Sequence, residues 1–220
     1  MLLPSRHHTA NFPQKHAGFS TVYRVVLKKI LHPPPPLPYP CAITPLGATG
    51  NDVYGFGAFD GVITTIWDAG GYDFIDMSGV TYAVDLDLAE GAFSTVAATG
   101  SNNLAIAFGT VIEDAIGSAY DDRIVGNDAA NRLSGGGGGD VLTGRGGADT
   151  FVFADNWGDD TITDFVRGED LLDFTDAVPS LENLTIESSG GNTVISYGGD
   201  SVTLQGVAAI DDSDFFVFVA

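Results

Sequence analysis

The sequence predicts an all-β fold, on three observations. After residue 51, short β-branched and aromatic runs are separated by Gly, Asn and Asp turns, as in successive strands. Residues 117–152 divide into four units of nine residues, a period that combines a tight turn with a short strand. Near the C-terminus, Val202 and Leu204 alternate with polar neighbours, as a half-buried strand requires. A helical pattern is confined to "FSTVYRVVLKKIL" and a turn near Ser180.

The four units of nine keep two columns of residues in step. They read GSAYDDRIV, GNDAANRLS, GGGGGDVLT and GRGGADTFV. The sixth position holds an acid or its amide: Asp122, Asn131, Asp140 and Asp149. The eighth position is apolar: Ile124, Leu133, Leu142 and Phe151. A disordered Gly/Asp linker has no reason to keep both columns in register, so the units indicate a folded repeat.

Each unit predicts half of a coil. Its first six residues form the turn, where Gly permits positive φ and leaves carbonyl groups unshielded. Its last three form a strand whose apolar side chain points inward. Units one and three therefore stack on one side, and units two and four on the other.

Stacked turns of this kind predict a calcium site. They bring carbonyls and two carboxyl-type groups around one point, and six or so oxygens at about 2.3–2.6 Å suit Ca²⁺ better than Mg²⁺. Oxygen ligands alone disfavour zinc and copper. Units one and two are degenerate, because Tyr120 and Ala129 replace Gly and Asn131 replaces Asp, so weaker sites are expected there.

Charge divides the chain into two kinds of polypeptide. Residues 1–51 contain no acid and hold all four His and the single Cys, whereas the rest has four Arg against 29 acids, a formal charge of −25. Such a surface disfavours nucleic acid and anionic membranes as partners and favours small cations. One Cys excludes an internal disulfide and a CxxC metal site. The apolar runs are too short to span a membrane.

Two regions are expected. Residues 1–45 form an unstructured basic, Pro-rich tail, since the polyproline run at 33–40 is extended and solvated. Residues 46–220 form the β domain, with the nonapeptide repeats at 117–152 and further strands at 181–220.

Residues 117–152 resemble the RTX calcium-binding β-roll. The flanking "TTIWDAGGYDFIDMSG", "VDLDLAEGAFSTV", "NLAIAFGTVIEDAIGSAYDDRIVGN" and "DTITDFVRGEDLLDF" resemble, in that order, the C-terminal domain of secreted serralysin-type metalloproteases. The resemblance covers about Thr49 to Phe174. It implies a parallel β-roll flanked by β-strands in a β-sandwich-like extension, and several bound Ca²⁺ ions.

The resemblance also implies a set of calcium ligands. "TGND" with "WDAGGYD" implies one site from Gly50, Asp52, Asp68, Gly70, Gly71 and Asp73, and "VIED" adds the Val111 carbonyl and Glu113. Units one and three supply carbonyls of Ser118, Tyr120, Gly135 and Gly137 with Asp122 and Asp140. Units two and four supply carbonyls of Asn127, Ala129, Gly144 and Gly146 with Asn131 and Asp149. Asp140 also faces the next coil through Gly136 and Gly138, with Asp164 and Asp170 as candidate closing ligands.

No catalytic set can be assembled from this sequence, so the chain is not expected to be an enzyme. The zinc motif HExxH needs two His flanking a Glu, yet the His are His7, His8, His16 and His32 and the first Glu is Glu90. Paired Asp could suggest a glycosidase, but their place in Gly-rich turns favours calcium ligation.

Three readings of function follow. The first is a non-catalytic, extracellular calcium-binding module. The second is a fragment of a zinc metalloendopeptidase whose catalytic domain lies on a separate or lost segment. The third is an RTX adhesin that binds a surface. "DDSDFFVFVA" resembles the uncleaved C-terminal signal of type I secretion, so the type I secretion apparatus is an expected partner and the protein is expected to be secreted.

Overall fold

The fold is described for residues 43–44, 50–56, 64–98 and 102–215 of a computed structural model. The expected helix at 19–31 and nearly all of the predicted tail lie outside these ranges. The described residues contain strands and two short 3₁₀ turns, η1 (Leu181–Asn183) and η2 (Asp212–Asp214), and no α-helix. The all-β prediction is confirmed, and the turn expected near Ser180 is η1.

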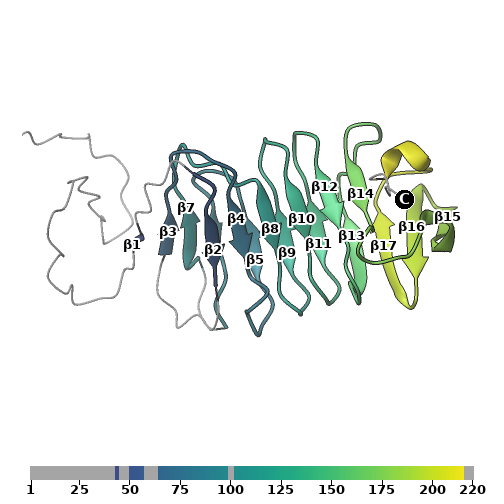
Figure 1. The fold of residues 1–220 in the computed structure, drawn as a ribbon, viewed down its shortest axis with the longest axis horizontal. Helices are drawn as coiled ribbons and strands as arrows, with labels where there is room; N and C mark the ends of the chain where they lie inside the picture. The colour runs from purple at the N-terminus through teal and green to yellow at the C-terminus, as the bar shows by residue number, and fades with distance from the viewer. Residues whose placement is uncertain (1–42, 45–49, 57–63, 99–101, 216–220) are drawn as a thin grey trace, which may run out of the picture. The chain divides into compact units, whose positions relative to one another are not determined.

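Two sheets form the body of the fold. Sheet I is parallel throughout and consists, in spatial order, of β14 (Leu171–Asp173), β12 (Thr150–Val152), β10 (Arg132–Ser134), β8 (Asp114–Ile116), β4 (Phe74–Asp76) and β2 (Val53–Gly55). Sheet II consists of β15 (Thr185–Ser189), β16 (Asn192–Tyr197), β17 (Asp200–Leu204), β13 (Asp159–Ile162), β11 (Val141–Thr143), β9 (Arg123–Val125) and β5 (Asp85–Asp87). Figure 1 shows β8 to β13 as successive half-coils that alternate between the sheets.

Strand register confirms the predicted stacking of the units. Arg123 of unit one lies opposite Val141 of unit three, and Arg132 of unit two lies opposite Thr150 of unit four. Both steps are 18 residues, which is two units of nine. One full coil therefore consists of two units, one strand in each sheet.

The apolar column fills the space between the sheets. Ile124, Leu133, Leu142 and Phe151 are all fully buried, as the predicted inward direction of position eight requires. Past the last unit, Phe153 and Phe174 stack at 4.4 Å between ring centroids, and Trp157 meets both rings edge-on. These aromatic rings close the core where the coils lengthen beyond 18 residues.

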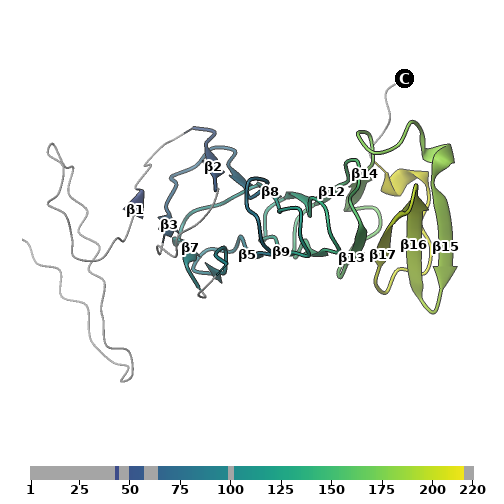
Figure 2. The same ribbon diagram turned by 90° about the horizontal axis from the view of Figure 1, so that it is seen from below.

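The C-terminal strands extend sheet II rather than forming a sheet of their own. β17 pairs in parallel with β13, and β16 and β15 then continue the sheet in antiparallel order, as Figure 2 shows. Val202 and Leu204 are fully buried while Ser201 and Thr203 are less so, which confirms the predicted alternation.

A third sheet lies at the N-terminal side of the coils. Sheet III has the order β1 (Ile43–Thr44), β3 (Thr64–Ile66), β7 (Leu104–Ile106) and β6 (Phe93–Ser94). β1 pairs with β3, so strand pairing already includes two residues that the sequence assigned to the tail.

Candidate metal sites

Each strand of sheet I is preceded by an acid or amide. We call these residues the sheet I series: Asp52, Asp73, Glu113, Asn131, Asp149 and Asp170. Most side chains of the series accept a hydrogen bond from the backbone N–H of the series member one coil earlier. The distances are 3.0 Å from Asp52 N to Asp73, 2.7 Å from Asp73 N to Glu113, 2.8 Å from Asn131 N to Asp149 and 2.9 Å from Asp149 N to Asp170.

Sheet II carries a matching series with apolar ends. The residues that share one register position along its parallel strands, here called the sheet II series, are Val84, Asp122, Asp140, Asp160 and Val202; the first three directly precede their strands, and Asp160 and Val202 lie within β13 and β17. Asp122 accepts from Val84 N at 2.7 Å, Asp140 from Asp122 N at 2.7 Å and Asp160 from Asp140 N at 2.9 Å. The coils are thus linked through carboxylates on both sides.

Glycines in the turns bring carbonyl and carboxylate oxygens together. A Cβ on Gly117 would overlap the Gly135 carbonyl and the Asp122 carboxylate, and one on Gly136 would overlap the Ser118 carbonyl. A Cβ on Gly135 would overlap the Asp140 carboxylate. The turns of units one and three therefore lie close enough for the oxygens expected as calcium ligands to face one shared space. Only Gly, which has no Cβ, leaves that space open.

Units two and four build the corresponding arrangement on the other side. A Cβ on Gly126 would overlap Asn131 Oδ1 and lie 2.5 Å from the Gly144 carbonyl. The Asp149 carboxylate lies against Gly144 in the same way. Gly146 N donates to the Asn127 carbonyl at 3.4 Å, and Gly147 lies against the Ala129 carbonyl.

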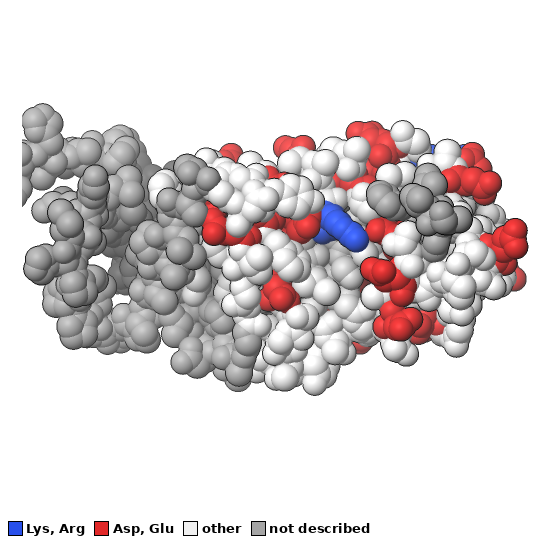
Figure 3. Space-filling model, in the orientation of Figure 1, with Lys and Arg blue, Asp and Glu red and all other residues white. Residues whose placement is uncertain are grey.

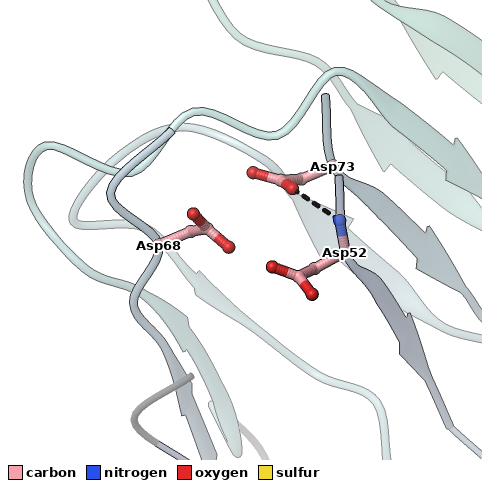
Figure 4. A group of neighbouring side chains, drawn as sticks. All are labelled: Asp52, Asp68 and Asp73. Atoms are coloured by element: carbon pink, nitrogen blue, oxygen red, sulfur yellow. Dashed lines mark hydrogen bonds between the residues drawn. The ribbon is translucent and has the colours of Figure 1, made fainter. Parts of the chain in front are cut away.

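Three carboxylates converge near the N-terminal end of the coils. Oxygens of Asp52, Asp68 and Asp73 all lie within 4.8 Å of one another (Figure 4). Asp68 accepts from the Tyr54 hydroxyl and from Gly70 N at 3.0 Å. A Cβ on Gly71 would overlap the Gly50 carbonyl, so this backbone lies against the same cluster. The structure thus brings together the residues that the sequence grouped around "TGND" and "WDAGGYD".

Three carboxylate oxygens in these clusters are buried without a hydrogen-bond donor. Asp52 Oδ2, Asp73 Oδ2 and Asp140 Oδ2 are buried and accept no hydrogen bond. A buried carboxylate oxygen without a partner is costly, and a cation removes that cost. Burial raises the pKa of Asp140 and Asp149 to about 7 and that of Asp160 to about 8. The backbone hydrogen bonds that these carboxylates accept lower the pKa values, but burial has the larger effect. Carboxylate and carbonyl oxygens of this kind and number are ligands that fit calcium.

The structure places the two acids expected to close the site beyond Asp140 beside other residues. Asp164 and Asp170 lie on the sheet I side, where Asp164 accepts from Gly144 N at 2.9 Å and from Arg145 N at 2.8 Å, and Asp170 accepts from Asp149 N. The carboxylate that follows Asp140 is Asp160. The coil between them is 20 residues long instead of 18, because Val141 pairs with Thr161, so a strict count of nine misses Asp160.

A simpler signal marks every member of both series that bears a carboxyl or amide group. Each is followed two positions later by a residue that is buried between the sheets, for example Asp160 by Ile162 and Asp170 by Leu172. This acid-x-apolar pattern recurs in both series even where the coil length changes, and it also occurs at acids outside them, such as Asp176 before Val178 and Asp200 before Val202.

The structure places the two ligands expected from "VIED" in different surroundings. Glu113 belongs to the sheet I series and faces Asp73, and burial raises its pKa. Val111 is exposed, and its neighbour Ile112 presents its carbonyl to the Asn127 and Asn131 side chains.

Acidic groups are more widespread than basic ones on the visible surface. On the face shown in Figure 3, Asp and Glu are scattered over the described coils and Lys or Arg is sparse. Within the described residues, no helix has the length and apolar character needed to cross a membrane.

Stacked half-coils that alternate between two sheets, with a carboxylate at most of the turns, define a parallel β-roll. The family model for the peptidase M10 serralysin C-terminal domain matches residues 47–211. The chain belongs to this family.

Similar proteins include whole proteases. The chain is 43% identical over 155 residues to serralysin G of Dickeya chrysanthemi, which covers 58% of this chain and 32% of that protein. It is 34% identical over 207 residues to the metalloprotease AprA of Pseudomonas entomophila, which covers 77% of this chain and 42% of that protein. The chain thus spans about a third to two fifths of these relatives.

Solved structures with a similar arrangement are more distant in sequence. The extracellular lipase LipA of Serratia marcescens aligns with a TM-score of 0.41 at 19% identity, over 78% of this chain and 39% of the lipase chain. The R3 subunit of the AlgE6 mannuronan C5-epimerase of Azotobacter vinelandii aligns with a TM-score of 0.38 at 23% identity, over 60% of this chain and 78% of that chain.

Proposed function

We propose that this chain is a non-catalytic calcium-binding β-roll module that is secreted and becomes stable outside the cell. One observation carries the proposal: two series of buried carboxylates face glycine turns, and several of their oxygens have no donor. Membership of the serralysin C-terminal family supports the same function.

The residues that would hold the ions fall into three groups. Asp52, Asp68 and Asp73 with nearby backbone carbonyls form the first. Asp122, Asp140 and Asp160 with the carbonyls of turns one and three form the second, and Asp149, Asp164 and Asp170 form the third. Bound calcium supplies positive charge between stacked turns, and the chain's own carbonyls and carboxylates bind and orient it.

Calorimetric titration of the purified chain tests this proposal. We expect binding of several Ca²⁺ ions at about 10⁻⁴–10⁻³ M, the range of extracellular modules, and much weaker binding of Mg²⁺. A chain that binds no calcium at millimolar concentration would exclude the function.

The expected affinity agrees with export through a type I secretion apparatus. A chain with about millimolar affinity stays open in a calcium-poor cytoplasm and folds when it meets external calcium. The C-terminal segment that resembles the secretion signal is described as far as Phe215, and residues 216–220 lie outside the described part. Removal of residues 211–220 should retain the chain in the cells of a host that carries the transporter.

A second candidate is the C-terminal part of a zinc metalloendopeptidase. This candidate is favoured because the chain covers only part of serralysin G and of AprA. The two candidates differ in the coding DNA upstream of this chain, where an in-frame or frame-shifted HExxH would favour the protease fragment. Under both candidates we expect the purified chain to cleave no casein with added zinc and calcium, and chelator-sensitive cleavage by a clean preparation would contradict both. Binding to a glycan or cell surface would instead favour an adhesin.

A further inference from the structure

The sheet I series is interrupted at one step. Between its other neighbours, the backbone N–H of one member donates to the next side chain, but Glu113 N donates to the Asp73 carbonyl at 3.1 Å instead. Asn131 Oδ1 accepts from Asn127 N in its own turn at 2.8 Å. The Asn131 side chain therefore turns its nitrogen, not its oxygen, toward the coil before it.

Two amide groups fill the space between these coils. Asn131 Nδ2 donates to the Ile112 carbonyl at 2.9 Å and to the Glu113 carbonyl at 3.1 Å. Asn127 Nδ2 donates to the Ile112 carbonyl at 2.7 Å and to the Leu88 carbonyl at 3.4 Å. Both Asn side chains are buried. The carbonyls that would face a cation at this step are already bonded to N–H groups.

An amide nitrogen is a donor and offers no lone pair to a hard cation. We propose that the space between Glu113 and Asn131 is closed to calcium, and that Asn127 and Asn131 link the two coils there by hydrogen bonds. This inference rests on the proposed calcium function. It divides the sheet I side into two separate groups, one around Asp52, Asp68 and Asp73 and one around Asp149, Asp164 and Asp170.

The division has a consequence for how the groups fill. No shared ion joins them on this side, so once the chain is folded, loss of a carboxylate in one group leaves the other group's affinity unchanged. Asp68→Asn should therefore weaken only one class of sites in a calcium titration over concentrations at which circular dichroism shows the variant to be folded. A change in every class would contradict the division.

Asn131→Asp tests the closure directly, because it replaces the donor by an oxygen of the same size. The variant turns a carboxylate oxygen toward the Ile112 and Glu113 carbonyls. Asn192→Asp is the matched control: Asn192 Oδ1 accepts from Gly206 N at 2.9 Å in an exposed hairpin, and Asp keeps that acceptor while adding the same charge. Bound calcium is counted by equilibrium dialysis, and thermal stability is measured by calorimetry at saturating calcium.

Two results support closure by the amides. Asn131→Asp either binds one ion more than the parent chain, because a carboxylate now admits it, or binds the same number and melts at a lower temperature than the Asn192→Asp control. The inference is overturned if the variant binds the same number of ions and keeps or gains stability, since an ion would then already occupy this space. A parent chain that binds no calcium is a different result and removes the proposed function itself.

Discussion

At the scale of single residues, glycine and aspartate together allow neighbouring turns to pack closely and to bond to each other. Gly135 has no Cβ where the Asp140 carboxylate lies, and Asp140 in turn accepts from Asp122 N while its second oxygen has no donor. The small residue makes the close approach of the turns possible, and the acid joins them.

Asp140→Asn should raise the calcium concentration needed for folding by at least about tenfold, because loss of even an outer-shell partner of a metal site costs about 10–100-fold. The amide still accepts from Asp122 N but carries no charge. Asp176→Asn removes the same charge from an exposed position and should change little. Circular dichroism during calcium titration measures both, and equal midpoints would show that Asp140 binds no ion.

Gly135→Ala should lower stability in saturating calcium by about 1–3 kcal/mol, the usual cost of forcing a methyl group into a packed space. Gly55→Ala is the control, since a Cβ there meets nothing within 4 Å. Calorimetric melting temperatures compare the two, with about 2–4 °C expected per kcal/mol. An unchanged Gly135→Ala chain would mean that the stacked turns lie further apart.

At the scale of elements, the C-terminal turn η2 is tied to the last coil. Asp214 is fully buried and accepts from Arg167 Nε at 3.0 Å, and Arg167 also pairs with Asp211 at 2.6 Å. Phe215 lies 6.2 Å from Phe174 between ring centroids, at the edge of the aromatic cluster. The coil that carries Arg167 also carries Asp164 and Asp170. The segment 211–215 therefore contacts a coil that holds candidate metal ligands.

Arg167→Ala should destabilise the folded chain more than Arg123→Ala does, because it leaves the carboxylate of Asp214, 1% exposed, without its cation. Arg123→Ala removes a pair with Asp85 whose side chains are 55% and 58% exposed, and should cost about 1 kcal/mol or less. Urea unfolding in saturating calcium gives both values. Similar losses in the two variants would show that η2 is not held by this pair.

At the scale of the whole molecule, self-repulsion opposes folding. Residues 52–220 carry 29 acidic side chains against four Arg, and stacking of the coils brings many of the acids close together. Under the proposed function, calcium binding energy becomes folding energy, as in other small metal-dependent domains.

At neutral pH the metal-free chain should be largely unstructured and should gain β structure in millimolar calcium. Far-ultraviolet circular dichroism with calcium, magnesium or chelator measures this change, with magnesium a poor substitute for calcium. A chelated chain that is already folded at pH 7.5 would contradict the switch.

Acid should partly replace calcium. Burial raises the pKa of Asp140, Asp149 and Asp160 to about 7, 7 and 8, so these groups bind protons more tightly in the folded chain than in the unfolded one. The contribution of these three groups to the stability of the metal-free fold is therefore fully present below about pH 4 and is lost as the pH rises to about 8. Circular dichroism in chelator should show more β structure at pH 4.5 than at pH 7.5. Greater order at pH 7.5 would contradict the raised pKa values.

The sequence by itself determined the repeat, the inward apolar column and the pairing of units one with three and two with four. Each of these follows from local spacing, because a nine-residue unit holds one turn and one strand. The position-six acids were also predictable from the period of nine, and the Asp52, Asp68 and Asp73 group was predicted from the resemblance to the serralysin C-terminal domain.

Only the tertiary structure decided how the coils beyond Phe151 stack. The next coil steps are 20 and 21 residues, so Asp160 and Asp170 each occupy the next place in a different series, and Asp164 closes on Gly144 and Arg145. Only the structure, likewise, decided that Asn131 turns its nitrogen toward the coil before it. An amide can present either its oxygen or its nitrogen to a neighbour, and the neighbour here, a pair of backbone carbonyls 18 and 19 residues earlier, is brought into place by the stacking of the coils.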